Sequence, residues 1–246
     1  MIQVFERALR AAEGRDLRFW LRDDDATRPG PVLDRLLALC ARHGVPPLLA
    51  VIPARLDPVL ADILPPQGRV ALHGWSHQNH AGPHQKKQEL GPHRPAPVVL
   101  EELAQGRAVL RQTFGARALD LLVPPWNRVS PEVTAGLPGI GIRALSAYGK
   151  ISARGMPVLN ADIDPIDWRA RRGLRHPALL WQKLALRVQV DRPVGILTHH
   201  MDHTPEVWDF LDRLMGMTAH CAWVTPDSFL PELTSFSSRS ADPARA

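Results

Sequence analysis

The stretch ALHGWSHQNH, residues 71–80, decides how the rest of the chain is interpreted. It begins in an apolar run and then places histidines at positions 73, 77 and 80. A separation of four residues puts His73 and His77 on one side of a helical or tight-turn backbone, close enough to share a metal ion. The pair His77 and His80 is the alternative. The stretch therefore predicts a metal site with imidazole ligands.

A second apolar run, residues 19–22, ends in the consecutive aspartates Asp23, Asp24 and Asp25. Carboxylates at the end of a buried strand cost free energy unless a cation lies among them. One of them could bind a metal ion while its neighbour accepts a proton from the attacking water. Zinc suits one aspartate and two histidines. The alternative is that the aspartates cap the next helix.

The composition fits one α/β domain: the chain has 246 residues, of which 45% are hydrophobic and 22% charged. No apolar run approaches the length of a membrane span, and residues 1–7 lack the apolar core of a signal peptide. The missing leader and the low cysteine count favour the cytoplasm. We expect a single domain over residues 1–233 and a disordered tail over residues 234–246.

The net charge of +5 is spread thinly along the chain, and no nucleic-acid-binding motif accompanies it. We therefore expect neither nucleic acid nor a membrane as a partner, and the pattern does not indicate an oligomeric state. The densest basic cluster is interpreted as a solvated surface; it consists of Arg169, Arg171, Arg172 and Arg175.

Short apolar runs alternate with helical patterns along the chain, after an amphipathic opening helix. The predicted strands are residues 17–22, 48–52, 69–72, 119–123, 142–145, 158–161 and 194–197. The predicted helices include residues 32–43, 98–114, 178–190 and 205–218. Strands that alternate with helices imply parallel strands with helical crossovers. We therefore expect an α/β fold, a (β/α) barrel of about seven parallel strands.

Residues that could carry chemistry follow the carboxyl ends of these strands, where parallel α/β folds place their sites. Trp126 has the first free backbone N–H after a double proline, and this N–H could stabilise an oxyanion. The last strand ends in His199 and His200, and one of these two histidines could protonate a leaving amine or serve as a third metal ligand. Residues 162–168 place the three acids Asp162, Asp164 and Asp167 beside Trp168, and one of these carboxylates could fix the tautomer of a histidine.

In this order the motifs resemble those of the polysaccharide deacetylase family, the NodB-homology carbohydrate esterases. That family has an Asp–Asp motif, an H-[ST]-x-x-H motif, a proline-aromatic motif, a D-x-x-D-W-like motif and a closing Leu-x-His. The matching positions here are Asp24–Asp25, His73–His77, Pro124–Trp126, Asp164–Trp168 and Leu197–His199. The resemblance covers residues 17–230 and implies an irregular (β/α) barrel.

The resemblance implies a metal-dependent N-deacetylase that hydrolyses the acetamide of an N-acetylated sugar or polysaccharide. Its metal would be Zn²⁺ or another divalent transition metal, held by Asp25, His73 and His77. Asp24 would be the catalytic base, or Asp23 if the aspartate run is read one residue earlier.

The other implied roles concern the acid and the substrate. His199 would be the catalytic acid, oriented by Asp167, and the Trp126 N–H would stabilise the oxyanion. The residues expected to contact a carbohydrate substrate are Trp75, Pro125, Trp168 and Leu197.

The chain departs from the family pattern at several positions. Gly74 stands where the family has a hydroxyl residue, and His200 follows the last motif histidine in place of aspartate. Val123 stands where the family has the arginine that steadies its base, with Arg128 as a possible replacement. Two alternatives therefore stay open: a metal-dependent hydrolase of a non-sugar amide, and a catalytically silent carbohydrate-binding member of the family.

Overall fold

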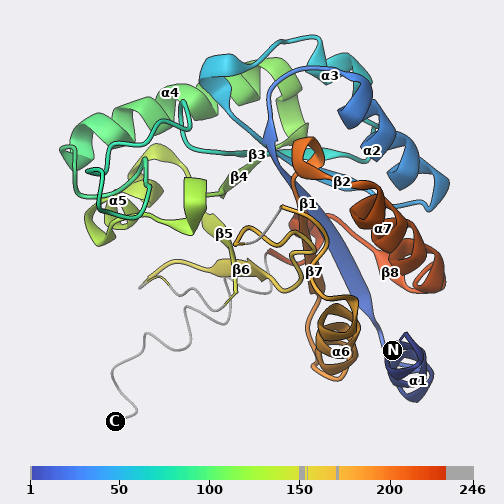
Figure 1. The fold of residues 1–246 in the computed structure, drawn as a ribbon. Coiled ribbons are helices and arrows are strands. Elements are labelled where there is room, and N and C mark those ends of the chain that lie inside the picture. The colour runs from blue at the N-terminus through green and yellow to red at the C-terminus, as the bar shows by residue number, and fades with distance from the viewer. Residues whose placement is uncertain (1, 150–152, 154, 170–171, 231–246) are drawn as a thin grey trace, which may run out of the picture.

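One parallel sheet organises the protein, as the computed structural model shows for residues 2–149, 153, 155–169 and 172–230 (Figure 1). The strand order is β6-β5-β4-β3-β2-β1-β7, and a short β8 pairs with β1. This confirms the expected (β/α) barrel of about seven parallel strands. The strands are β1 (Arg18–Ala26), β2 (Pro47–Val51), β3 (Arg69–Leu72), β4 (Ala118–Leu122), β5 (Ala144–Tyr148), β6 (Val158–Ala161), β7 (Val194–Thr198) and β8 (Ala222–Trp223).

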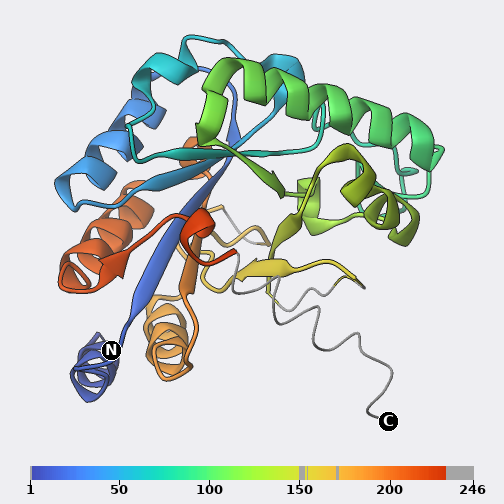
Figure 2. The same ribbon diagram turned by 180° about the vertical axis from the view of Figure 1, so that it is seen from behind.

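The helices lie on the outside of this sheet, and α1 and α6 lie side by side (Figures 1 and 2). The longer helices match the predicted ranges, whereas the short α3 and α5 were not predicted. A proline in the first turn begins each of α2, α4, α5, α6 and α7, where the missing N–H costs nothing. The helices are α1 (Gln3–Ala11), α2 (Pro31–Arg42), α3 (Leu60–Ile63), α4 (Ala96–Phe114), α5 (Pro131–Gly136), α6 (Pro177–Arg187) and α7 (Pro205–Met217).

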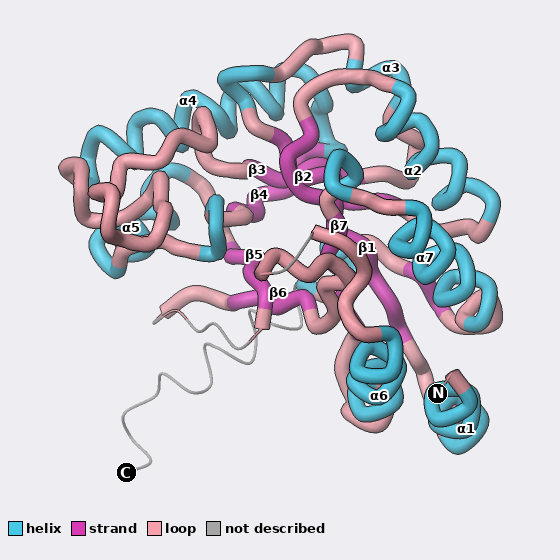
Figure 3. Tube along the Cα trace, viewed as in Figure 1, coloured by secondary structure: helices cyan, strands magenta, loops and turns pink. Residues whose placement is uncertain are grey.

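The segment that follows β6 joins the two ends of the sheet. The backbone N–H groups of Asp162 and Ile163 donate to the Gly195 carbonyl at 2.8 and 3.0 Å, and Leu197 N–H donates back to Ile163 at 2.7 Å. Gly195 is required there because a Cβ would lie 2.4 Å from the Trp20 ring. Figure 3 shows the strands gathered at the centre of the molecule, with loops at their ends.

The two faces of β1 have different surroundings, because successive side chains of a strand point to opposite faces. Leu21 packs into the large core shared with the helices, whereas Trp20 belongs to a second core, inside the barrel. Arg22 and Asp24 follow Trp20 on the inner face. The sequence predicted a strand that ends at residue 22, before the aspartates. In the structure β1 continues through the three aspartates to Ala26.

None of the described helices combines the length and the apolar character needed to cross a bilayer. The tail predicted over residues 234–246 lies outside the described residues.

Candidate active site and metal centre

A cavity of about 650 Å³ opens at the carboxyl ends of the strands. Its walls come from β1, from the carboxyl-terminal parts of β5 and β7, and from the loops that follow β3, β4, β6 and β7. The predicted site residues that line it are Asp24, Asp25, His73, His77, Trp126, Trp168, Leu197 and His199. The topology therefore gathers most of the predicted site in one place.

Asp25, His73 and His77 form the group that could hold a metal ion. Each offers one ligand atom, and these atoms all lie within 4.8 Å of one another. Asp25 Oδ1 is 3.1 Å from His73 Nε2 and 3.4 Å from His77 Nε2. His80, the alternative ligand, is not in this group, which is the cluster found among the described residues.

The environment of His73 fits a cation at this position. Its Nδ1 lies 2.8 Å from the carbonyl oxygen of Val123, so Nδ1–H donates there and Nε2 keeps its lone pair in the neutral ring. That lone pair faces the Asp25 carboxylate, and two acceptors at this distance need a proton or a cation between them. When a proton takes this place, Nε2–H donates to Asp25: burial lowers the pKa of His73, but this hydrogen bond and the charges of Asp24 and Asp25 raise it above the ordinary value. One carboxylate and two imidazoles suit zinc.

Backbone strain is concentrated around the cavity. Of the described residues, the non-glycine ones with positive φ are Asp25, His77, Trp126, Asn127 and Arg172, and all of them line it. Each such conformation costs on the order of 1–3 kcal/mol and persists where the surroundings enforce it. At Asp25, with φ of 69°, the pairing of β1 with β2 also shifts register between Asp23 and Ala26. This irregularity turns the Asp25 carboxylate toward the two histidines.

The geometry predicts that Asp25→Ala loses the metal. Removing an outer-shell partner of a metal ligand typically costs about 10–100-fold in affinity, and we expect removal of the carboxylate itself to cost at least that. Metal content after dialysis and zinc titration calorimetry measure the effect. His80→Ala is the matched control and should bind zinc like the wild type. If His80→Ala lost the metal and His73→Ala kept it, the alternative histidine pair would be correct.

Asp24 is held by a buried arginine. The Nε and Nη2 atoms of Arg22 donate to its two oxygens at 2.8 and 3.0 Å, and Arg22 and Asp24 are 0% and 4% exposed. His199 Nε2 lies 3.8 Å from Asp24 Oδ2. Asp24 and His199 therefore face the same part of the cavity, beside the three candidate ligands.

Asp23 points away from the cavity. It is 0% exposed, and its carboxylate accepts hydrogen bonds from the Thr198 hydroxyl at 2.7 Å and from the His200 backbone N–H at 2.8 Å. Its second oxygen lies 2.5 Å from Nδ1 of His200. A carboxylate enclosed in this way has no access to a substrate. The geometry thus favours Asp24 over Asp23 as the base.

On the side of the cavity that contains His199, the expected catalytic acid, the motif aspartate that lines the cavity is Asp164. The aspartate expected there was Asp167. Asp164 is 3% exposed, and its Oδ2 accepts the Trp168 indole N–H at 2.8 Å. The Trp168 ring meets the His199 ring edge-on, with centroids 4.7 Å apart. Asp167 does not line the cavity, and its Oδ1 accepts the backbone N–H of Arg169. The chain after β6 continues along β7, and this places Asp164 inward. Burial raises the pKa of Asp164 despite its hydrogen bonds.

Trp126, whose backbone N–H was expected to stabilise the oxyanion, lines the cavity, with its ring centroid 4.3 Å from that of His77. The Trp126 backbone N–H has no hydrogen-bond acceptor among the described residues. Trp75 and Pro125 do not line the cavity. The backbone carbonyl of Trp75 accepts a hydrogen bond from the Ala54 N–H, which fixes the loop at this point. Pro125 is buried.

Glu89 is a buried residue beside the candidate site, and nothing in the sequence indicated its position. It is 1% exposed, and its Oε1 accepts the backbone N–H groups of Trp75 and Ser76 at 3.2 and 2.8 Å, beneath the turn that carries His77. A Cβ on Gly74, which has φ of 63°, would lie 1.9 Å from Glu89 Oε2. The Glu89 carboxylate therefore leaves no room for a side chain at position 74, where the resemblance led us to expect a hydroxyl residue.

The basic cluster is partly a cavity wall and not simply a solvated surface. Arg172 and Arg175 line the cavity, and Arg172 forms an ion pair of 3.1 Å with Asp202. Arg171 lies outside the described residues. Arg128 also lines the cavity, but its Nη1 donates to the Lys87 carbonyl at 3.0 Å, and it makes no hydrogen bond to Asp24.

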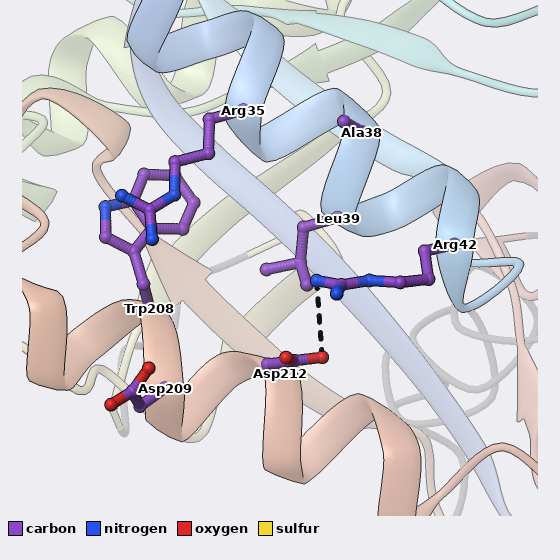
Figure 4. A pocket seen from close by; sticks show the side chains of 7 residues that line it. All are labelled: Arg35, Ala38, Leu39, Arg42, Trp208, Asp209 and Asp212. Atoms are coloured by element: carbon purple, nitrogen blue, oxygen red, sulfur yellow. Dashed lines mark ion pairs between the residues drawn. The ribbon is translucent and has the colours of Figure 1, made fainter.

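A second hollow lies between α2 and α7 and is unrelated to this site (Figure 4). The Arg35 guanidinium lies over the Trp208 ring at 4.5 Å, and Arg42 pairs with Asp212 at 3.4 Å (Figure 4). Asp212 also lies 2.6 Å from Nε2 of His43. These contacts tie the two helices together, and we assign the hollow a structural role.

No protein-family model matches the sequence, and no curated protein sequence is similar enough to count as a relative. Solved structures do match over most of the chain. Peptidoglycan deacetylase PdaC from Bacillus subtilis is 18% identical, with a TM-score of 0.55, over 94% of this chain and 96% of that one.

Two further solved structures have the same architecture. A family 4 acetyl xylan esterase from Clostridium thermocellum, in complex with a cobalt ion, is 16% identical with a TM-score of 0.56, over 89% of this chain and 91% of that one. A mutant of BA3943, described as a CE4 family pseudoenzyme, is 15% identical with a TM-score of 0.56, over 86% of this chain and 65% of that one. At these identities the likeness shows the fold, which is that of carbohydrate esterase family 4 and its polysaccharide deacetylases.

Proposed function

We propose that this protein is a metal-dependent N-deacetylase that hydrolyses the acetamide of an N-acetylated sugar or polysaccharide. The observation that supports this best is the placement of Asp24 and His199 together beside Asp25, His73 and His77 in one cavity. A base, an acid and three metal ligands are the groups that metal-assisted amide hydrolysis needs. The fold likeness to deacetylases and esterases of acetylated polysaccharides is consistent with it.

Asp25, His73 and His77 would hold the metal ion, which when bound supplies a Lewis acid for the acetyl carbonyl and lowers the pKa of water. Asp24 takes a proton from the attacking water while the water oxygen adds to the carbonyl carbon. The Trp126 N–H donates to the developing oxyanion. His199 then gives a proton to the nitrogen as the C–N bond breaks, and the products are an amine and acetate.

The cavity walls suit a sugar. Trp168 is 38% exposed and presents an apolar ring beside His199, and Leu197 also lines the cavity. Because Arg172 and Arg175 also line the cavity, acidic acetylated sugars belong in the substrate panel. The cytoplasmic location stays a prediction.

Acetate release from N-acetylated sugars and chito-oligosaccharides by the zinc-loaded protein tests the proposal. We expect release by the wild type and none after metal removal by a chelator, with recovery on adding zinc. Release from non-sugar acylamides alone would favour the first alternative. Bound metal with no release from any acetylated compound, combined with retained binding of oligosaccharides, would favour the silent carbohydrate-binding alternative.

A further inference from the structure

Arg22 is a buried arginine whose guanidinium is held on several sides inside the barrel. Besides its paired contacts with Asp24, its Nη1 donates to the Ser146 hydroxyl at 2.6 Å and lies 3.4 Å from the Ala147 carbonyl. Ser146 is itself 0% exposed and belongs to β5. The plane of the guanidinium is therefore fixed by groups from β1 and from a strand across the barrel.

Position 123, where the family pattern has an arginine, does not supply one here. The Val123 side chain is 0% exposed and belongs to the apolar core inside the barrel. The other sequence candidate, Arg128, makes its hydrogen bond to Lys87. Arg22 fills the role geometrically because residues two apart in a strand share a face, so that Arg22 and Asp24 both point inward from β1.

We infer that Arg22 is the positioning residue for Asp24 and takes over, from within β1, the part of the arginine missing at position 123. This inference rests on the proposed function. A bidentate guanidinium–carboxylate pair fixes both the plane and the rotamer of the carboxylate. Arg22 does not line the cavity, so it acts through Asp24 and not on the substrate.

Three variants test the inference in zinc-loaded protein, with acetate release as the assay. Arg22→Lys keeps the charge and loses the fork, and we expect kcat to fall about 10–100-fold because a small misplacement of a reacting group has an effect of this size. KM and zinc content should stay within about twofold, since neither depends on the carboxylate plane. Arg22→Leu should lose more.

The relocation variant Arg22→Leu/Val123→Arg returns an arginine to the barrel interior from the residue that follows β4. We expect it to regain at least about tenfold in kcat over Arg22→Leu, a recovery that a purely structural role for Arg22 does not provide. Arg107→Lys is the matched control, because Arg107 pairs with Asp120 at 2.9 Å outside the cavity. Its kcat should equal that of the wild type.

Wild-type kcat in a folded Arg22→Lys protein would overturn the inference and leave the proposed function standing. So would a loss of kcat that came with a matching loss of zinc or of the folded state in Arg22→Lys, because Arg22 would then be structural. A zinc-loaded wild type without any turnover would overturn the proposed function and this inference together. Circular dichroism and thermal melts of each variant separate these outcomes.

Discussion

Asp24→Asn is expected to lower kcat for acetate release by about 10²–10⁴-fold, the usual contribution of a general base. The amide is nearly isosteric with the carboxylate and keeps one oxygen that can accept from Arg22. Its NH2 group faces the second donor of the buried guanidinium, so a thermal melt must accompany the kinetics to show that the variant is folded. The amide has no negative charge with which to take a proton from water. Zinc binding should persist because Asp24 is not among the three candidate ligands.

Steady-state kinetics on zinc-loaded protein, together with metal content, measure this prediction. Asp120→Asn is the matched control: Asp120 pairs with Arg107 and Arg111 at 2.9 and 2.8 Å, as Asp24 pairs with Arg22, but it lies outside the cavity. Its kcat should be unchanged. If Asp24→Asn turned over substrate at the wild-type rate, the base would have to be another group.

Most of the fold could be predicted because hydrophobic runs and helix signals are local. The bounds predicted for β3 and β6 agree with the structure, since each is a short apolar run between turn residues. β8 was not predicted, because a strand of two residues is too short to show an alternating hydrophobic pattern. The carboxyl-end rule for parallel strands then brought Asp24, His73 and His199 to one edge without any knowledge of their contacts.

The alternation of inward and outward side chains along β1 could have been predicted from the sequence, but it was not part of the prediction. Because side chains alternate along a strand, one face receives Trp20, Arg22 and Asp24 and the opposite face receives Leu21 and Asp23. With Asp24 inside the barrel, Arg22 becomes its natural partner. The backbone irregularity that turns Asp25 toward the histidines has no comparable sequence signal, because it arises from pairing with β2.

Contacts between distant loops account for the remaining differences. Glu89 supports the turn at residues 74–77 from more than ten positions away, and only the folded chain shows that its carboxylate occupies the place of a side chain at Gly74. Likewise, the motif alone does not tell which of its two aspartates, Asp164 or Asp167, faces the cavity. The pairing of Ile163 with Ile196 in the folded chain decides that it is Asp164.

Asp23→Ala is expected to destabilise the protein strongly and to affect the chemistry little. Asp23 is a fully buried residue of β1 opposite Thr198 of β7, and its carboxylate pairs with His200 and accepts the Thr198 hydroxyl. The pKa of His200 is raised: burial lowers it, but the charge of Asp23 and the hydrogen bond to it more than offset this effect. Removing Asp23 leaves the buried His200 imidazole, the His200 backbone N–H and the Thr198 hydroxyl without their acceptor.

Breaking a buried ion pair on one side typically costs about 3–5 kcal/mol in the free energy of unfolding. For a domain of this size, about 2–4 °C of melting temperature is lost per kcal/mol, so Tm should fall by roughly 6–20 °C. Urea unfolding and thermal melts measure the change. Asp23→Ala/His200→Phe should recover part of the loss, because it removes the orphaned imidazole along with its partner.

The activity of Asp23→Ala at low temperature separates the two readings of the aspartate run. If Asp24 is the base, the fraction of Asp23→Ala that is folded should turn over substrate within about tenfold of the wild type, because Asp23 touches neither the cavity nor the candidate ligands. An inactive Asp23→Ala protein with wild-type Tm would assign the proton transfer to Asp23 instead. The structure argues against that outcome, because a carboxylate that already accepts from Thr198 and His200 would have to give up both contacts to reach a water molecule in the cavity.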